Sequence, residues 1–375
     1  MNEPSSAQTA GSRPNLKDLN YAALQAQMAV WGEPKFRTRQ LWQWLYVHHA
    51  TEYAQMTNLP RALRERLAQF YRLDTPTLVD ELWSADGLTQ KLLFELHDGA
   101  MIESVGMAYD QRWTVCVSSQ VGCAVGCSFC ATGKGGFVRH LDTGEIVEQV
   151  LYFSRRLGAT GEARPAAAPR AVSNIVLMGM GEPLLNYDRV WQAIEIWNDH
   201  RGFDLGARRI TLSTAGVVPG ILRLAEERLQ VGLAVSLHAA EDGLRDQLVP
   251  LNKRYPLADL MAACHEYVDQ TRRRVTIEYC LIEEVNDAPQ QAHQLARLLR
   301  GLLCHVNLIP LNPVAAASTP EGSAFSTPSR DRVRAFQRVL TQSGLPATVR
   351  LRRGIDIQAG CGQLRQRHGK EKTNA

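Results

Sequence analysis

Hydrophobic residues recur at helical spacing along the first part of the chain. Tyr21, Leu24 and Met28 lie three or four positions apart, a spacing that puts apolar side chains on one face of a helix. The same spacing returns in Leu63, Leu67 and Tyr71, after breaks at Gly32-Glu33-Pro34 and Asn58-Leu59-Pro60. The pattern predicts a small helical domain over residues 16–86, preceded by a disordered tail at residues 1–15.

A different pattern follows this domain. Residues 89–96 alternate weakly between polar and apolar, His97-Asp98-Gly99 is typical of a tight turn, and residues 100–107 are suited to a returning strand. We therefore expect a β-hairpin linker over residues 87–112.

From Trp113 onward, short apolar runs alternate with amphipathic stretches. The predicted strands are 114–118, 174–178, 209–213, 232–237, 275–280 and 305–309. The predicted helices between them are 143–157, 187–200, 217–229, 257–271 and 289–302. Strand–helix alternation predicts parallel strands joined by crossover helices. Six such units are too few for a closed eight-fold barrel, so we expect an α/β fold, an open partial (β/α)6 barrel over residues 113–364.

The remaining segments carry other signals. A helix at 331–343 and a strand at 347–351 are predicted to follow the barrel units, and a basic tail occupies 365–375. Residues 155–172 are rich in Ala, Pro, Gly and Arg without an apolar period, which indicates a flexible surface insertion.

Composition narrows the class of protein. No apolar run reaches the roughly 18 residues that a membrane span needs, and the polar N-terminus is unlike a signal peptide. Eight cysteines in 375 residues, several of them clustered, are more typical of metal binding or catalysis in a reducing cytosol than of a disulfide scaffold. We therefore expect a cytoplasmic protein with no membrane association.

Charge and aromatic residues leave two interpretations open. The formal net charge of +4 is too small to indicate nucleic acid by itself, but basic residues gather at 35–39, 61–66 and 350–372. Such patches can neutralise phosphates or simply form a solvated surface. Trp42, Trp44 and Tyr46, which lie among basic residues, suit either RNA stacking or the core of the helical domain.

Three cysteines form the strongest chemical motif. Cys123, Cys127 and Cys130 are spaced Cys-x3-Cys-x2-Cys directly after the first barrel strand. Three thiolates can hold a [4Fe–4S] cluster and leave its fourth iron open to a further ligand. Zinc is the rival metal, with Cys116 as a fourth ligand.

The other cysteines differ in their settings. Cys264, Cys280 and Cys304 fall within helix or strand patterns and are predicted to be buried core thiols. Cys361 lies between Gly360 and Gly362, so we expect a mobile backbone and an unshielded thiol there.

Polar residues stand at the ends of successive predicted strands. They are Gly181, Glu182, Ser213, Ser236, His238 and Asn312, with Leu237 between two of them. Each of these residues alone is suited to a cap or a turn. As a set they stand at the carboxyl ends of successive strands, where a cofactor pocket lies in this type of fold. Gly133-Lys134-Gly135-Gly136 lacks the spacing of a phosphate-binding loop, which argues against nucleotide hydrolysis.

These motifs together carry a resemblance. The cysteine triad on a loop after the first strand resembles the radical S-adenosylmethionine (SAM) superfamily. Residues 115–123, 178–183, 212–214, 236–239 and 360–364 are similar to the bacterial dual-specificity RNA methyltransferase family. The similarity extends from about residue 16 to residue 364, without the 155–172 insertion.

The resemblance implies a fold, cofactors and a substrate. It implies a radical SAM barrel with an RNA-binding helical accessory domain, one [4Fe–4S] cluster on Cys123, Cys127 and Cys130, and two SAM molecules per turnover bound at the strand-end residues. The substrates would be an adenosine of 23S ribosomal RNA at the peptidyl transferase centre and an adenosine of transfer RNA, both methylated at C2. An external one-electron donor and a disulfide reductant are implied as partners, and we expect a monomer.

The resemblance also implies three catalytic side chains. Cys361 would receive a methyl group from SAM, Glu103 would remove the C2 proton, and Cys116 would release the product by forming a disulfide with Cys361. By itself Glu103 is an acidic residue in a strand, a position that is usually solvated. The RNA base would have to be extruded from its stack to reach the site.

Two other functions remain open at this point. Relatives that confer antibiotic resistance share the motifs and methylate C8 of the same adenosine. A non-catalytic iron–sulfur or zinc RNA-binding module would make Cys361 and the strand-end residues incidental.

Overall fold

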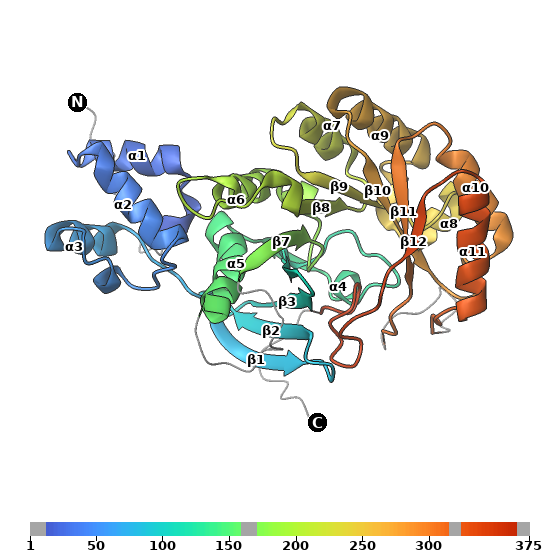
Figure 1. Cartoon of the computed structure of the whole chain (residues 1–375), viewed down its shortest axis with the longest axis horizontal. Helices are drawn as coiled ribbons and strands as arrows, with labels where there is room; N and C mark the ends of the chain where they lie inside the picture. Colours follow the sequence, from blue (N-terminus) through green and yellow to red (C-terminus); the bar gives the residue numbers. More distant parts are fainter. Residues whose placement is uncertain (1–12, 159–170, 315–323, 366–375) are drawn as a thin grey trace.

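The computed structural model of the chain describes residues 13–158, 171–314 and 324–365. Most of the tail predicted at 1–15, most of the insertion predicted at 155–172 and nearly all of the tail predicted at 365–375 lie outside these ranges. Figure 1 shows a group of short helices on one side and a curved sheet with flanking helices on the other.

The N-terminal helices form as the apolar spacing predicts. They are η1 (Leu16–Asp18), α1 (Tyr21–Val30), α2 (Lys35–Tyr46), η2 (Tyr53–Gln55) and α3 (Arg61–Phe70). Asn20 caps α1, because its side chain accepts a hydrogen bond from the Ala23 backbone N–H at 2.9 Å. Trp42 and Tyr46 are 1% exposed and pack ring to ring at 4.4 Å. Those two aromatics are core residues, whereas Trp44 is half-buried and donates to Asn58.

Polar contacts join this helical domain to the barrel. Lys17 and Glu148 of α5 (Thr143–Gly158) form an ion pair in which both side chains are at most 1% exposed. Asp18 accepts a hydrogen bond from the Gly144 N–H at 2.8 Å, and Gln192 donates to the Asp18 carbonyl at 2.6 Å. The domain is therefore held against the first crossover helix by buried polar groups.

A ten-stranded sheet forms the rest of the framework. Its order is β1 (Thr77–Trp83), β2 (Thr89–Glu95), β3 (Met101–Tyr109), β4 (Arg112–Cys116), β7 (Val172–Leu177), β8 (Ile210–Thr214), β9 (Gly232–Ser236), β10 (Val275–Leu281), β11 (Cys304–Pro310) and β12 (Ala347–Val349). All pairs from β4 to β12 are parallel. The six predicted barrel strands are confirmed, each within a few residues of its expected bounds.

The hairpin region differs from the expected linker. β2 and β3 form the predicted hairpin, but β3 also pairs antiparallel with β4, and β1 pairs with β2. The three strands therefore extend the barrel sheet, and β1 lies inside the range that we assigned to the helical domain. β3 is buried along most of its length, with only its two end residues partly exposed, so this extension is part of the core.

Helices cover the outer side of the parallel strands (Figure 1). Besides α5 they are α6 (Tyr187–Asn198), α7 (Val218–Glu226), α9 (Leu257–Thr271), α10 (Pro289–Leu298) and α11 (Arg330–Gln342). Shorter elements are the β5–β6 hairpin (Gln120–Gly122 and Phe137–His140), α4 (Ala131–Lys134) and α8 (Asp242–Leu248). The arrangement confirms the predicted partial α/β barrel, in which parallel strands bring their carboxyl ends to one edge.

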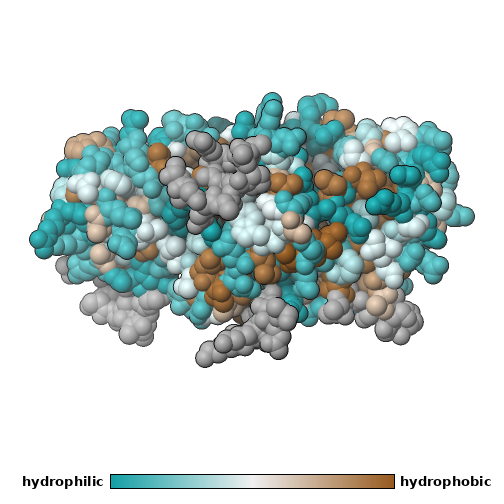
Figure 2. All heavy atoms as spheres, turned by 60° about the horizontal axis from the view of Figure 1, so that its bottom comes forward, coloured by the Kyte–Doolittle hydropathy of each residue, from teal (hydrophilic) through white to brown (hydrophobic). Residues whose placement is uncertain are grey.

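The surface agrees with the composition. Figure 2 shows a face on which hydrophilic residues predominate and hydrophobic ones are gathered near the middle. None of the helices in the described ranges combines the length and the apolar character that a membrane crossing needs.

Candidate active site

Two neighbouring cavities lie at the carboxyl edge of the parallel strands. The first, the Cys116 cavity, has a volume of about 110 Å³ and is lined by residues that include Val105, Met107, Cys116, Asn312 and Cys361. The second, the strand-end cavity, has a volume of about 160 Å³; its lining includes Cys123, Cys127, Cys130, Gly181, Glu182, Ser213, Ser236 and His238. Cys130, Arg350 and Cys361 line both, so the two cavities share a wall.

The three motif cysteines lie on the loop between β5 and α4. Their side chains pack against a small apolar cluster that contains Val125 and Phe129. Burial raises the pKa of Cys123 to about 12 and raises the pKa of Cys127 and Cys130 as well. Such thiols stay protonated in water but lose their protons to a bound cation, so metal binding here would release protons.

The spacing of these thiols bears on the choice of metal. A single tetrahedral zinc ion with Zn–S bonds of about 2.3 Å would hold its sulfur atoms roughly 3.8 Å apart. Among the described residues, the one group of three possible ligand atoms that lie within 4.8 Å of one another is formed by His97, Asp98 and Glu145. The three cysteine sulfurs do not form such a group in this structure, and Cys116 faces the other cavity.

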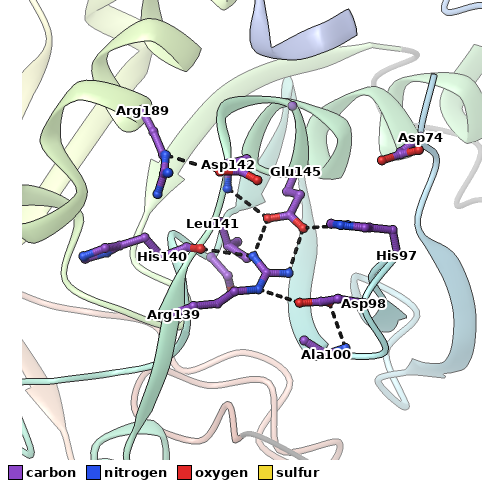
Figure 3. A network of polar contacts seen from close by, with 12 residues as sticks. Asp74, His97, Asp98, Ala100, Arg139, His140, Leu141, Asp142, Glu145 and Arg189 are labelled. Carbon is purple, nitrogen blue, oxygen red and sulfur yellow. Dashed lines mark hydrogen bonds and ion pairs between the residues drawn. The ribbon is translucent and has the colours of Figure 1, made fainter. Parts of the chain in front are cut away.

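The group of His97, Asp98 and Glu145 has a structural explanation. Figure 3 shows the Arg139 guanidinium between the two carboxylates, with its Nε 2.7 Å from Asp98 and its two Nη atoms 2.7 and 2.9 Å from Glu145. His97 lies 3.5 Å from Glu145 on the other side. Because Arg139 already donates hydrogen bonds to both carboxylates, the network fastens the β2–β3 turn to β6 and α5.

Glu182 is the acidic group of the strand-end cavity. It is 3% exposed, and its carboxylate accepts hydrogen bonds from the Leu184 and Ala215 backbone N–H groups at 3.0 and 2.7 Å. Burial raises its pKa to about 7. The backbone turns at Gly181, directly before Glu182. This position favours glycine, because its φ is +108° and a Cβ would lie 2.6 Å from Gln120. A carboxylate with spare lone pairs can accept further hydrogen bonds from an ammonium group.

His238 has a fixed tautomer. Its φ is +64°, and its Nδ1 accepts a hydrogen bond from the Cys280 N–H at 3.0 Å. Burial lowers its pKa to about 3, so the ring is neutral and its hydrogen lies on Nε2. This nitrogen is a donor for a ligand in the cavity.

A buried arginine supports two of the strand ends. Arg245 of α8 is 0% exposed and donates to the carbonyls of Ala215 at 2.7 Å and Leu237 at 3.0 Å. These residues follow β8 and β9, which end close to Ser213 and Ser236. Arg245 therefore fixes the loops that shape the cavity, a role that its sequence position did not indicate.

Two predicted cofactor-binding residues lie elsewhere. Leu237 is 0% exposed, packs in the main hydrophobic core, and uses its N–H to bond Glu278 and its carbonyl to bond Arg245. Asn312 lines the Cys116 cavity instead and donates to the Cys361 carbonyl at 3.1 Å. Thus Leu237 contributes packing, and Asn312 contacts the segment that carries Cys361.

The two thiols outside the triad share the Cys116 cavity. All eight cysteines are free thiols, and Cys116 and Cys361 come together although they are distant in sequence. Burial raises the pKa of Cys116 to about 12. The Cys361 thiolate raises the pKa of Arg350, which lies beside it in both cavities. Cys264, Cys280 and Cys304 are buried as predicted, but Cys280 also lines the strand-end cavity.

The glycines beside Cys361 fix the backbone rather than loosen it. A Cβ on Gly360 would lie 2.6 Å from the Asn312 side chain, and Gly362 has a φ of +82°. The expected mobile backbone is therefore a tightly packed turn, which holds the Cys361 thiol half-exposed between the two cavities.

Glu103 lies in the wall behind the Cys116 cavity. It is 0% exposed, in contrast to the solvated position that is usual for an acidic residue in a strand. It lies on the same face of β3 as Val105 and Met107, which line the cavity. Its carboxylate accepts a hydrogen bond from the Arg365 N–H at 3.0 Å. Its own carbonyl accepts from the Ser118 hydroxyl, which in turn accepts from the Met180 N–H. These bonds connect Glu103 to the loop that carries Glu182.

Comparison with known families divides the chain in two. Residues 14–73 match the family described as the ribosomal RNA large subunit methyltransferase N-terminal domain. Residues 117–296 match the radical SAM superfamily. The second match contains the cysteine triad, Glu182, Ser213 and His238.

Individual relatives extend the similarity over nearly the whole chain. The probable dual-specificity RNA methyltransferase RlmN of Chloroflexus aurantiacus is 52% identical, covering 94% of this chain and 93% of the relative. Dual-specificity RNA methyltransferase RlmN 1 of Myxococcus xanthus is 48% identical, covering 94% of each chain. A crystal structure of a radical SAM methyltransferase from Sphaerobacter thermophilus is 51% identical and superposes with a TM-score of 0.87, covering 94% of this chain and 99% of that one.

Proposed function

The chain belongs to the dual-specificity RNA methyltransferase RlmN family of radical SAM enzymes, and from this premise we propose that it methylates C2 of an adenosine in 23S ribosomal RNA and in transfer RNA. One observation carries the proposal: Cys116 and Cys361 share a cavity beside the cavity of the cysteine triad. A protein that only bound a metal and RNA would not need a second pair of thiols at this place.

The residues present fit the cofactors that the family implies. Cys123, Cys127 and Cys130 would hold the [4Fe–4S] cluster, since their thiols face one cavity while Cys116, the fourth ligand that zinc would need, lines the other. Glu182 can accept from the SAM ammonium group, and His238 and the hydroxyls of Ser213 and Ser236 are available to its other polar groups. When bound, the cluster and SAM supply a methyl group and a radical that removes hydrogen from unactivated carbon.

Three side chains of the chain itself would then act in order. The Cys361 sulfur would accept a methyl group, and the carbon of that group, after losing one hydrogen to the radical, would form the new bond to C2 of the adenine. Glu103 takes the proton from C2 of the adenine once the new carbon–carbon bond exists. Cys116 attacks the Cys361 sulfur, so that a sulfur–sulfur bond forms, the sulfur–carbon bond breaks and the released carbon takes up a proton.

The surroundings of the Cys116 cavity suit an RNA substrate. Arg350, Arg352 and Arg353 line it, and guanidinium groups bind phosphates and stack on bases. Lys35, Arg39, Arg61 and Arg66 of the helical domain are exposed and add positive charge. An adenosine extruded from a loop could reach the cavity while the helical domain held the rest of the RNA.

The other parts of the proposal concern partners. We infer a cytoplasmic monomer that needs an external one-electron donor and a thiol reductant for the Cys116–Cys361 disulfide. Two SAM molecules would be used per turnover, one as methyl donor and one as radical source.

Mass spectrometry of RNA tests the proposed function. The full chain, reconstituted with iron and sulfide without oxygen, should convert adenosine to 2-methyladenosine in a 23S ribosomal RNA fragment when SAM and a reductant are added. The Cys361→Ala variant should retain the iron of the cluster but form no methyladenosine. A methyl group at C8, or an intact cluster that never cleaves SAM, would contradict the proposal.

A further inference from the structure

An arginine stands in the wall that the two cavities share. Arg350 follows β12, and its backbone N–H donates to the Leu308 carbonyl of β11 at 2.8 Å, so its backbone is fixed to the barrel sheet. Arg352 and Arg353 line only the Cys116 cavity, whereas Arg350 lines both cavities, as Cys361 does. Of these three arginines, Arg350 is therefore the one whose place matches that of Cys361.

The Arg350 guanidinium has hydrogen-bond donors to spare. Within the described part of the chain, the hydrogen bond found for its side chain goes to the Met178 sulfur at 3.8 Å. A guanidinium carries five N–H donors, so most of them are available to a molecule in the cavities. Other polar side chains of the Cys116 cavity already donate to backbone carbonyls: Thr132 to Leu364, Asn312 to Cys361 and Arg353 to Ala108.

The surroundings of Arg350 place its charge on the side of the two thiols. The groups that raise the pKa of Arg350 are, with the largest effect first, Cys361, Glu278, Tyr109 and Cys116, while burial lowers it. Cys361, Tyr109 and Cys116 line the Cys116 cavity, and Glu278 lines the strand-end cavity. Because electrostatic attraction falls with distance, the guanidinium lies close to the thiols that would carry out the reaction.

The proposed bond also fixes where the adenine lies. If the carbon on the Cys361 sulfur bonds to C2, the base lies against Cys361 in the Cys116 cavity. The ring nitrogens N1 and N3 flank C2, and in adenine both are acceptors without a hydrogen of their own. Arg350 is the side chain beside Cys361 that has unused donors, so its guanidinium would meet one of these nitrogens.

We infer that Arg350 is a catalytic residue that donates a hydrogen bond to N1 or N3 of the target adenine; this inference rests on the proposed function. The new carbon–carbon bond uses one electron from the carbon on Cys361 and one from a C2–N π bond, so the other π electron stays on the ring. When the C2 proton is then removed, the electron pair of the C2–H bond also stays and leaves the ring negatively charged. The guanidinium stabilises this charge at the nitrogen that it contacts.

Substrate analogues that lack one ring nitrogen test the contact. In 1-deazaadenosine and 3-deazaadenosine a C–H group replaces N1 or N3, so a hydrogen bond from Arg350 cannot form at that atom. Single-turnover methylation of the 23S ribosomal RNA fragment is measured with adenosine or either analogue at the target position. The reconstituted full chain is compared with Arg350→Met. The result for each protein is a ratio of two rates, so a smaller folded fraction of the variant leaves the comparison valid.

We expect one of the two analogues to react more slowly than adenosine, by a ratio that is about 10- to 100-fold larger in the wild type than in Arg350→Met. A hydrogen bond from a charged group contributes a factor of this size. The effect of the missing nitrogen on the ring itself is present in both proteins and cancels. Arg352→Met removes the same charge from another arginine of the Cys116 cavity; it is the matched control and should keep the wild-type ratio.

The opposite result is equally clear. Equal ratios in the wild type and in Arg350→Met, for both analogues, would overturn the inference about Arg350. If SAM bound more weakly to that variant in calorimetry as well, Arg350 would be assigned to the cofactor instead of the base. Failure of the proposed function is distinguishable, since the wild type would then form no 2-methyladenosine from the unmodified RNA.

Discussion

At the scale of single residues, the two thiols of the Cys116 cavity are prepared for different tasks. Cys361 is half-exposed and lines both cavities, so its sulfur is accessible for the methyl transfer proposed above. Cys116 is 8% exposed, and its burial raises the pKa of its thiol to about 12. A thiol that is seldom ionised does not compete with Cys361 for the methyl group. It is therefore suited to act last, as the group that releases the product.

This division predicts what happens when Cys116 is removed. The Cys116→Ala variant should build up RNA covalently attached at Cys361, because the thiol proposed to break the sulfur–carbon bond is gone. Denaturing gel electrophoresis and peptide mass spectrometry would detect the adduct. Cys304→Ala, which removes another buried thiol, is the control and should accumulate none. Free turnover by Cys116→Ala would rule out its role in release.

The pH dependence of release follows from the same burial. The thiolate fraction of Cys116 rises about tenfold with each pH unit below its pKa of about 12. Release of RNA from Cys361 should therefore accelerate between pH 7 and pH 9, as measured by the disappearance of the adduct after a pH jump. A release rate that did not change with pH would show that another group deprotonates Cys116 within the complex.

At the scale of elements, the strand ends need support from the short helix α8. Arg245 supplies it by donating to the carbonyls of Ala215 and Leu237, and it also donates to the Asn252 side chain at 2.8 Å and to the Ser236 carbonyl at 3.3 Å. Burial lowers the pKa of Arg245 to about 10, so it remains a cation at neutral pH. Its bonds are charge-assisted and hold two loops of the strand-end cavity in one arrangement.

Removing this guanidinium should damage both stability and cofactor binding. Arg245→Met removes the guanidinium donor from the Ala215 carbonyl, whereas the Leu237 carbonyl keeps the Ala239 N–H at 2.9 Å. Leaving one buried acceptor unsatisfied costs about 1–3 kcal/mol. We expect a lower melting temperature and weaker SAM binding, measured by thermal unfolding and by calorimetry on the reconstituted protein. Arg254→Met, at an exposed arginine nearby, is the control. Unchanged SAM affinity in Arg245→Met would mean that the loops keep their arrangement without it.

Elements with a clear apolar period were predictable from the sequence, and those without one were not. The helix at 257–271 has the predicted bounds, because its spacing is helical throughout. β1 was missed because Asp80 and Glu81 break the alternation on an edge strand, and α8 because it is short and polar. The burial of Lys91 and Glu103 was not predictable either, since each side chain is accommodated by a partner on another strand.

The same contrast holds within the site. The cysteine triad, Gly181, Glu182, Ser213, Ser236 and His238 line one cavity, and the sequence could predict this neighbourhood because short motifs place them at strand ends. Leu237 was predicted with them, but its own side chain faces the core while its neighbours face the cavity. The roles of Arg245 and Arg350 depend on contacts between segments that are far apart in sequence.

At the scale of the whole molecule, substrate RNA would have to engage two parts that are joined by buried polar contacts. The helical domain is joined to α5 by Lys17, whose ammonium group contacts Glu148 and donates to the Asp74 carbonyl at 2.8 Å. Burial lowers the pKa of Lys17, because the ammonium group loses its hydration. The attraction between Lys17 and Glu148 acts against this loss and favours the charged form of the lysine. Glu148 also pairs with Arg155 at the end of the same helix. The domain contact therefore depends on a small buried charge network.

Breaking one side of that network should loosen the domain without touching the chemistry. Lys17→Met leaves Glu148 paired with Arg155 alone, so the unfolding free energy should fall, by less than the about 3–5 kcal/mol that an uncompensated buried charge costs. In the double variant Lys17→Met, Glu148→Leu the partly exposed Arg155 also loses its partner, so only part of that loss should be recovered. Denaturant unfolding of the three proteins measures both effects.

In Lys17→Met, methylation of a large folded RNA should fall more than SAM cleavage without RNA, because only the former needs the helical domain in place. Equal losses in both assays would mean that the domain supports the barrel itself rather than the grip on RNA.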